Sequence, residues 1–248
     1  MCDYIDVYYF KWLGNNRTFN EALNVLPSAS SNLKPGFFIS PYDNFTRNRD
    51  IGLPKNYDPK IWWESTQNEL VELFLETTGK SKNWYEELKI GDSNKQGDEG
   101  EEFEAFTMLQ LEAEGLFYGV YRPSKPLNSQ EKLLNTDARF KSYNQTIISG
   151  NPTIIDIKRV IDPAALAARN RYERSLDLQL NDIVASVKKQ QDRATNQFNE
   201  TVIHVINLLH VRPCDRLLVE VTFREKANIA GIDLERVIFL NTNPRAIY

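Results

Sequence analysis

Cysteine and histidine are scarce in this chain. Its 248 residues include two cysteines, Cys2 and Cys214, and two histidines. This is too few cysteines for a disulfide framework or a cysteine zinc site, and no zinc site of histidine and cysteine can be assembled. Low cysteine use is typical of proteins in a reducing compartment, so we expect a cytoplasmic location.

Long hydrophobic runs are also missing. No stretch of 18 apolar residues occurs, so no membrane span and no membrane partner are expected. The opening residues, MCDYID, lack the basic and apolar regions of a signal peptide. The hydrophobic fraction of 41% is nevertheless enough for a core. The length fits one large domain, or a core domain with an elaboration before it.

An excess of positive charge is the third absence. The formal net charge is −4 and the pI is about 5.4. Nucleic-acid-binding domains are often basic, so the overall charge does not indicate one. It does not exclude one either, because affinity for phosphates depends on where the charges lie. A catalytic nuclease would also carry carboxylates of its own.

The first 95 residues form an N-terminal region whose function the sequence does not define. The expected elements are a strand at 4–13, loops at 25–60, and a helix at 61–77 that starts after Asp58-Pro59 and ends at Gly79. Residues 90–101 are polar and contain glycine, which makes them the best linker candidate. We interpret residues 1–95 as an elaboration for recognition or dimerisation.

Residues 96–248 alternate between helical and strand patterns. We expect helices at 101–115, 164–198 and 200–210, and strands at 116–126, 136–149, 152–161, 215–223 and 235–242. This order predicts an α/β or α+β core in which helices flank a central mixed sheet.

The strand at 152–161 carries two charges inside an apolar run. Asp156 and Lys158 are two residues apart, so they lie on the same face of a strand, opposite Ile155 and Ile157. Burying either charge alone would be costly. A paired acid and amine at a strand end are explained if the acid holds a metal ion and the amine stabilises negative charge or positions a water.

A second acid, Asp137, lies 19 residues before Asp156 (156 − 137). A hairpin that turns around residues 149–151 would bring both carboxylates to the same end of the sheet. Two carboxylates together with a phosphate oxygen and waters suit Mg²⁺, which prefers oxygen ligands. The pair therefore predicts a Mg²⁺ site that can activate water for phosphodiester hydrolysis.

Asp137 followed by Asp156-x-Lys158 resembles the PD-(D/E)xK signature of the restriction-endonuclease-like nucleases. Gly100-Glu101-Glu102-Phe103-Glu104 is similar to the G-x-x-F-E helix that often precedes it, and the resemblance spans residues 99–240. Thr136 stands where the signature has proline. The motif is short, and its order within predicted elements gives it weight.

The resemblance implies a restriction-endonuclease-like core and a role for each motif residue. Asp137 and Asp156 would bind Mg²⁺. Lys158 would orient or deprotonate the attacking water or neutralise the phosphate, and Glu104 would bind a second metal or its water. Glu101 and Glu102 are weaker candidates, since helical phase decides which acid points inward. A type II restriction endonuclease that cuts double-stranded DNA as a homodimer is the leading form.

Three other interpretations stay open. The chain could be a nuclease of the same fold that works in phage defence, in transposition or as a toxin, on RNA or single strands. It could be a non-catalytic relative that binds nucleic acid or protein. Asp156 and Lys158 could also form an ordinary ion pair on an edge strand, with Asp137 as a strand-start residue, and such surface pairs contribute little to stability.

Basic residues near the motif are candidates for phosphate contacts. The candidate nucleic-acid-binding residues are Arg159, Arg169, Arg171, Lys188 and Lys189 after the motif, and Asn44 and Arg47 in the N-terminal region. Acidic residues are interleaved with the later cations, so a solvated helix face is the competing interpretation. His204 and His210 are interpreted as packing or surface residues, and Glu220 as a rival site acid that lacks a lysine partner.

Overall fold

The computed structural model describes residues 59–90, 99–123, 129–134, 136–161, 176–211 and 215–241. Several sequence predictions lie outside these ranges: the strand at 4–13, nearly all of the loops at 25–60, most of the linker, and the candidates Asn44, Arg47, Arg169 and Arg171. None of the helices in the described ranges has the length and the apolar character needed to cross a bilayer.

Two helices precede the core. Helix α4 (Pro59–Thr78) confirms the predicted helix at 61–77, and Gly79 ends it with a φ of 64°, a conformation that glycine adopts without steric cost. Helix α5 (Lys82–Leu88) follows at once. The side chain of Ser81 accepts a hydrogen bond of 3.1 Å from the backbone N–H of Trp84, so Ser81 caps the first turn of α5.

Helix α6 (Glu99–Ala113) confirms the helix predicted at 101–115. Acidic side chains occupy its first turn, where they favour the positive end of the helix dipole. An apolar run, Phe103 to Leu111, is buried on the sheet side and the α4 side of the helix. A helix covered on both sides is apolar around much of its circumference, which explains why this segment shows little amphipathic contrast.

The central sheet has three parallel strands in the order β3-β4-β5. These strands are β3 (Ile154–Arg159), β4 (Val202–Asn207) and β5 (Val237–Leu240). A separate antiparallel pair joins β1 (Phe117–Tyr118) to β2 (Ser142–Tyr143). The described residues therefore form the mixed α/β fold that the sequence predicts, with a sheet that is small and parallel at its centre.

Two predictions are wrong: a predicted helix is a strand, and a predicted strand is a helix. Residues 200–210 were expected as a helix, but they contain β4, the central strand. Residues 215–223 were expected as a strand, but they begin helix α10 (Arg216–Ile229). A central parallel strand is buried on both faces and reads as a continuous apolar run rather than an alternating one. In α10, Val219, Phe223 and Ala227 recur every four residues, which is helical spacing.

The strands expected at 116–126 and 136–149 are much shorter than predicted. Besides β1 and β2, these segments contribute only isolated antiparallel bridges, between Tyr121 and Arg139 and between Ala138 and Ile155. The expected strands at 152–161 and 235–242 are confirmed as β3 and β5. Of the long helix expected at 164–198, the described part is α9 (Leu176–Arg193), which ends in a π-helical turn at Ala194–Phe198.

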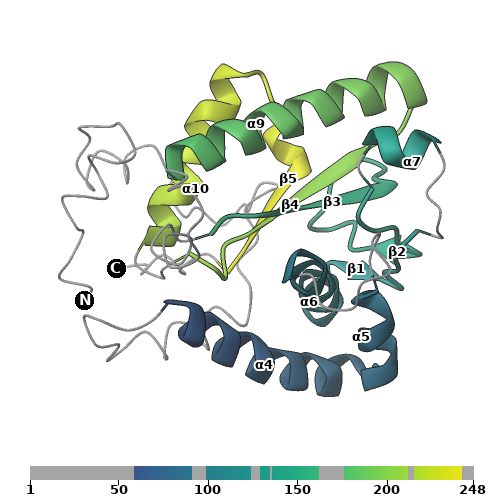
Figure 1. Ribbon diagram of the computed structural model, residues 1–248. Coiled ribbons are helices and arrows are strands. Elements are labelled where there is room, and N and C mark those ends of the chain that lie inside the picture. The colour runs from purple at the N-terminus through teal and green to yellow at the C-terminus, as the bar shows by residue number, and fades with distance from the viewer. Residues whose placement is uncertain are drawn as a thin grey trace.

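Helices cover both faces of the sheet (Figure 1). Helices α9 and α10 pack on one face, where they bury residues such as Ile206 and Phe239. Helix α6 packs on the other face, and α4 lies outside α6. Short segments complete the chain: α7 (Ser129–Leu134) precedes the turn to β2, and a 3-10 turn at Leu234–Arg236 precedes β5.

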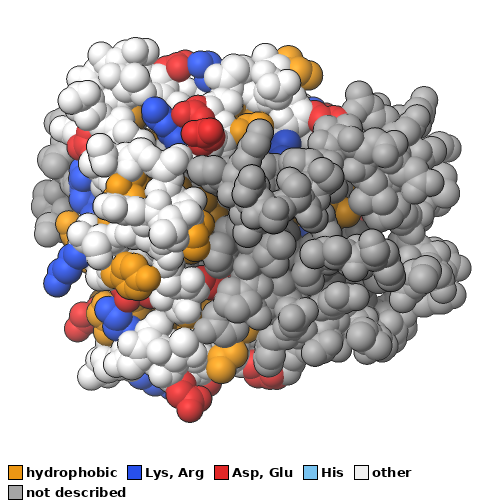
Figure 2. Space-filling view, turned by 180° about the vertical axis from the view of Figure 1, so that it is seen from behind, with side chains coloured by type: hydrophobic (Ala, Val, Ile, Leu, Met, Phe, Trp, Pro, Cys, Tyr) orange, Lys and Arg blue, Asp and Glu red, His pale blue; other side chains and the backbone are white. Residues whose placement is uncertain are grey.

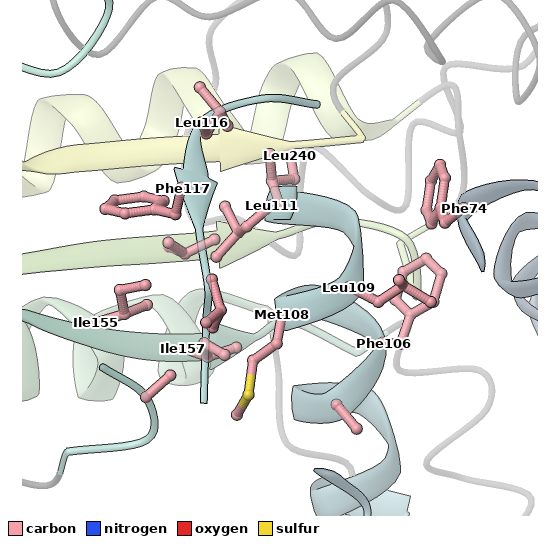
Figure 3. Close-up of a cluster of buried hydrophobic side chains, with 14 of the residues drawn as sticks. Phe74, Phe106, Met108, Leu109, Leu111, Leu116, Phe117, Ile155, Ile157 and Leu240 are labelled. Atoms are coloured by element: carbon pink, nitrogen blue, oxygen red, sulfur yellow. The ribbon is translucent and has the colours of Figure 1, made fainter. Parts of the chain in front are cut away.

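The core between α6 and the sheet shows the pleat of the strands directly (Figure 3). Ile155 and Ile157 of β3 and Leu240 of β5 point toward Met108 and Leu111 of α6. Because side chains alternate along a strand, the residue between Ile155 and Ile157 must face the opposite side. That residue is Asp156, and its face is covered by α9.

Candidate functional site

The candidate site lies at the free edge of β3. Strand β3 pairs with β4 on one side. On its other side it meets the preceding segment of the chain at a single bridge between Ala138 and Ile155. The backbone N–H groups of Asp137 and Ala138 both donate to the carbonyl of Ile155, at 3.2 and 3.1 Å. The two segments thus run antiparallel, as the hairpin prediction required, and they separate at Asp137.

The carboxylate of Asp137 takes the place of a strand partner at that separation. Its Oδ2 accepts a hydrogen bond of 2.6 Å from the backbone N–H of Ile157. An edge N–H that loses its ladder partner needs another acceptor, and the carboxylate supplies one. The Ala138–Ile155 bridge sets an antiparallel register in which residue 137 lies directly opposite residue 156. Asp137 is therefore held beside Asp156.

Asp156 lies at the centre of a buried polar cluster. Its carboxylate is fully buried, and Oδ1 accepts from Lys158 Nζ at 2.5 Å and from Gln190 Nε2 at 3.1 Å. Its Oδ2 lies 2.8 Å from Nδ1 of His204. An ionised carboxylate only accepts hydrogen bonds, so Nδ1 of His204 carries the proton. The prediction that Asp156 and Lys158 share one face, opposite Ile155 and Ile157, is confirmed.

His204 is the residue that sequence reasoning missed. It was interpreted as a packing or surface residue on a helix, but it lies on β4 directly opposite Asp156 in the parallel register. Gln190, from α9, was missed as well. The only available signal was the run Val202–Asn207, whose β-branched content favours a buried strand and would have placed a histidine beside the motif.

The pKa values of the two aspartates are shifted in opposite directions. Burial opposes the charge of Asp156, but Lys158 and His204 outweigh it and lower the pKa of this carboxyl group below its ordinary value. Burial, together with the negative charges of Asp156 and Glu104, raises the pKa of Asp137 well above its ordinary value, although Lys158 and the N–H of Ile157 act against this. Asp156 and Glu104 therefore both add negative charge to the surroundings of Asp137.

Glu104, on α6, contributes one of these negative charges. Its Oε2 forms an ion pair of 2.7 Å with a guanidinium nitrogen of Arg122. The same arginine donates to the backbone carbonyls of Glu101, at 2.9 Å, and of Leu88. Arg122 thus ties the start of α6 to the end of α5 and holds Glu104 at the rim of the site. Glu102 instead pairs with Lys89, at 3.4 Å.

We call Glu104, Asp137, Asp156, Lys158 and His204 the edge site. Asp137 and Asp156 lie opposite each other, Lys158 and His204 contact Asp156, and Glu104 affects Asp137 through its charge while it pairs with Arg122. The structure does not bring the described nucleic-acid candidates to the same place. Arg159 lies on the α6 face, 5.6 Å from the ring centre of Phe103, and donates to the carbonyl of Glu99 at 3.2 Å.

Lys188 and Lys189 lie along a groove of about 760 Å³ between α9 and α10. Lys188 is paired with Asp192 at 2.7 Å, and Lys189 is exposed. Gln190, the next residue, turns to the sheet and contacts Asp156, so the two lysines face away from the edge site. Glu220 is also separate from it, because it pairs with Arg224 within α10 at 2.8 Å.

The edge site offers carboxylate oxygens, which hard cations prefer, but too few protein ligands to surround a metal ion. Among the described residues, no three His, Cys, Asp or Glu side chains are grouped so that they could hold a metal ion by themselves. Mg²⁺ needs fewer protein ligands than that, since it commonly binds through one or two carboxylates with waters and substrate phosphates as the rest. Asp137 and Asp156 fit this requirement. Burial and the negative charges of Asp156 and Glu104 raise the pKa of Asp137, and a cation would offset those charges.

The fold and the site define a mixed α/β chain with a buried aspartate and histidine and a partly buried lysine at the edge of a small parallel sheet. Comparison with known protein families, with curated proteins and with solved structures finds no match to this chain.

His204→Leu is expected to destabilise the fold. The leucine would leave Asp156 Oδ2 buried without the donor at 2.8 Å, at a cost of about 2–3 kcal/mol for a charged acceptor. His204→Asn keeps a short amide donor and is expected to recover at least half of that loss. Urea unfolding of both variants measures the difference. Equal losses for leucine and asparagine would show that the hydrogen bond is not what His204 contributes.

Proposed function

We propose that this protein is a Mg²⁺-dependent endonuclease that hydrolyses phosphodiester bonds of DNA, with a restriction-endonuclease-like core. The observation that carries the proposal is the convergence of Asp137 and Asp156 at the point where two antiparallel segments separate. Lys158 and Glu104 lie close enough to influence the charge of these acids. A divalent cation would offset the negative charges around Asp137, and a nearby lysine can neutralise a phosphate.

The residues of the edge site have separable roles in this proposal. Asp137 and Asp156 would hold Mg²⁺, which when bound supplies a Lewis acid that lowers the pKa of water and stabilises charge on a phosphate. The Lys158 side chain is 13% exposed, so it lies just below the surface beside Asp156. It would neutralise the scissile phosphate or position the attacking water. Glu104 would hold a second ion or a water at the rim of the site.

His204 and Gln190 orient the site from beneath. Both donate to Asp156 and neither is exposed, so they fix the direction in which the carboxylate presents its remaining lone pairs. Among the described residues, Nε2 of His204 and Oε1 of Gln190 have no hydrogen-bond partner. The orienting residues come from β4 and α9, so the packed core rather than a loop sets the position of Asp156.

The specific form we propose is a type II restriction endonuclease that acts on double-stranded DNA as a homodimer. This rests on the motif resemblance and on a length that allows a nuclease core plus recognition elements. The same core in a defence, transposition or toxin nuclease would give an enzyme that acts on RNA or single strands, and substrate choice separates these forms.

One observation favours a different class of function. Asp156 already accepts from Lys158, Gln190 and His204, so its charge is compensated without a metal. A non-catalytic relative that keeps the fold for binding nucleic acid or protein would show the same internally satisfied cluster.

Cleavage assays with Asp156→Asn test the proposal. Wild-type protein is expected to cut plasmid DNA in Mg²⁺ and not in EDTA, and Asp156→Asn is expected to lose roughly 10²–10³-fold in rate, as for the loss of one electrostatic contributor. Asp192→Asn, an exposed acid on α9 that pairs with Lys188, is the matched control and should keep wild-type activity.

The products and substrates distinguish the forms of the enzyme. Discrete fragments from duplex DNA support a restriction enzyme, whereas unspecific degradation, or preference for RNA or single-stranded DNA, supports the other nucleases. Equal rates for wild type and Asp156→Asn would refute the assignment of the edge site. Absence of cleavage across substrates and divalent metals would support the binding relative instead.

A further inference from the structure

We propose that a second pocket, beside the edge site, binds one nucleotide of the substrate strand through the ring of Tyr121 and the ammonium group of Lys141. We call it the tyrosine pocket. The inference rests on the proposed function, because it gives the substrate strand a path away from the cleaved phosphate. It adds a binding element that the nuclease motif does not contain.

The tyrosine pocket is a cavity of about 440 Å³ on the outer side of the β1–β2 region. Its lining residues are Tyr121, Arg139, Phe140, Lys141, Ser142, Tyr143, Gln145, Pro152 and Thr153. The volume lies within the range of about 300–1,000 Å³ found for small-molecule sites. Aromatic rings, two cations and small hydrogen-bonding groups occur together here, a composition that suits a base with its phosphate.

Tyr121 and Lys141 are the side chains available to a ligand. The side chain of Tyr121 is 44% exposed, and an exposed aromatic ring offers a face on which any base can stack. Lys141 is exposed, and within the described ranges it forms no ion pair. Its ammonium group is therefore free to contact a phosphate, which is the usual source of affinity for nucleic acid.

The shape of the backbone keeps Lys141 over the pocket. Gly119 has a φ of 65°, and a Cβ atom there would lie 2.8 Å from Cδ of Lys141. The methylene chain of Lys141 thus runs across the bare backbone of Gly119. Any larger residue at 119 would strain the backbone and displace the lysine.

The other walls are held by their own contacts. The hydroxyl of Tyr143 donates to the carbonyl of Gly150 at 2.7 Å, and its ring meets Phe140 edge-on with 5.9 Å between centroids. Arg139 pairs with Glu200 at 3.6 Å and donates to the carbonyl of Thr153 at 3.4 Å. A pocket whose walls are held by such contacts needs little ordering when it binds.

The tyrosine pocket is continuous with the edge site along one stretch of chain. Asp137, Arg139 and Lys141 alternate, and the side chains of Asp137 and Arg139 both reach across to the backbone of the β3 segment, at Ile157 and Thr153. The four residue steps from Asp137 to Lys141 span roughly 13 Å if the chain is extended. This equals about four nucleotides of a stacked nucleic-acid strand, at about 3.4 Å each. A strand whose phosphate lies at Asp137 therefore reaches the pocket within a few nucleotides.

Basic, acidic and hydrophobic side chains are interspersed along the left edge of the face seen in Figure 2. Tyr118, on β1, is 45% exposed but does not line the pocket, which makes it a useful comparison.

Binding of fluorescein-labelled 20-nucleotide DNA of mixed sequence, single-stranded and duplex, tests the inference in Ca²⁺ by fluorescence anisotropy. Tyr121→Ala is expected to weaken binding of at least one form by about 5- to 100-fold, the usual effect of losing one stacked base. Lys141→Gln is expected to lower the salt dependence by close to one phosphate contact. Tyr118→Ala and Lys132→Gln, both at exposed positions outside the pocket, serve as matched controls.

A crosslink gives a second measurement that uses the wild-type protein and so does not depend on whether a variant folds. DNA that carries 5-iodouracil near the cleaved position should form a photo-crosslink to Tyr121 in the wild type, located by mass spectrometry. Wild-type affinity and salt dependence in both pocket variants, or equal losses in the controls, would overturn the inference. Loss of cleavage in Asp156→Asn with unchanged binding in the pocket variants would refute the pocket alone. Pocket-dependent binding without any cleavage would refute the nuclease alone.

Discussion

Asp137→Asn is expected to make the protein more stable at neutral pH, whereas Asp156→Asn is expected to make it less stable, although both changes are expected to slow the proposed cleavage. The two residues lie together, but their environments differ. Asp137 is crowded by Asp156 and Glu104, and Asp156 is compensated by Lys158 and His204. Opposite effects on stability with the same effect on activity would identify Asp137 as a residue retained for function.

The pH dependence follows from the direction of each pKa shift. The raised pKa of Asp137 means that the folded state binds this proton more tightly than the unfolded chain does, so its contribution favours folding in acid and is lost as the pH rises through the raised value. The lowered pKa of Asp156 acts in reverse. Its contribution is present above the ordinary aspartate pKa and is lost as the pH falls through the lowered value.

The expected magnitudes are large enough to measure. Replacing Asp156 leaves Lys158 and His204 buried beside a neutral amide, at a cost of about 3 kcal/mol. Replacing Asp137 removes one of the repelling charges but keeps an acceptor for the N–H of Ile157, a gain of roughly 1 kcal/mol. Guanidinium unfolding at pH 5, 7 and 8 measures both, with Asp192→Asn as the exposed control.

The two variants also predict a response to metal. Mg²⁺ or Ca²⁺ should raise the unfolding temperature of the wild type and leave that of Asp137→Asn unchanged, because a ligand that binds only the folded state stabilises it. A variant at position 137 that is less stable than the wild type at pH 8 would contradict the electrostatic account of the edge site.

Asn207→Leu is expected to cost about 3–4 kcal/mol in unfolding free energy, the largest stability loss predicted outside the edge site. Asn207 ends β4 and is fully buried. Its amide donates to Thr107 at 2.9 Å and to Gln110 at 3.2 Å, both on α6. Its carbonyl oxygen accepts from the N–H of Leu209 at 3.0 Å and from Asn241 at 2.6 Å.

Leucine has the same branching as asparagine and is the larger residue, so the loss would come from polar groups and not from a cavity. Several buried donors and acceptors would lose their partner at once, and each unsatisfied group costs about 1–3 kcal/mol. The expected fall in unfolding temperature is about 10 °C for a chain of this size. Asn196→Leu, at an exposed position in the π-helical turn, is the control. A loss below about 1 kcal/mol would mean that the network relaxes or admits water.

The parts of the fold that were predictable are those with local chemical signals. Pro59 and Gly79 mark the ends of α4, and Gly115 follows α6, so both helices could be located from the sequence. The alternation of Ile155, Asp156, Ile157 and Lys158 gave the two faces of β3 correctly, because the period of a strand is a property of its backbone.

The exchanged elements show where local signals fail. Val202–Asn207 and Arg216–Ile229 are both rich in apolar residues over a short span. Such runs fit a buried strand and a buried helix about equally, and only their place in the sheet or on its face decides between them. Because His204 was assigned to a helix, its position opposite Asp156 could not be foreseen.

The sequence by itself determined the two faces of β3 and the positions of helices α4 and α6. It also predicted that Asp137, Asp156 and Lys158 lie near one another. Tertiary structure alone decided that β4 lies in the middle, that His204 and Gln190 hold Asp156, and that Lys188 and Lys189 face away from the site. The physical reason is that periodicity and capping act within a few residues, whereas a strand's neighbours and a carboxylate's donors come from segments tens of residues apart.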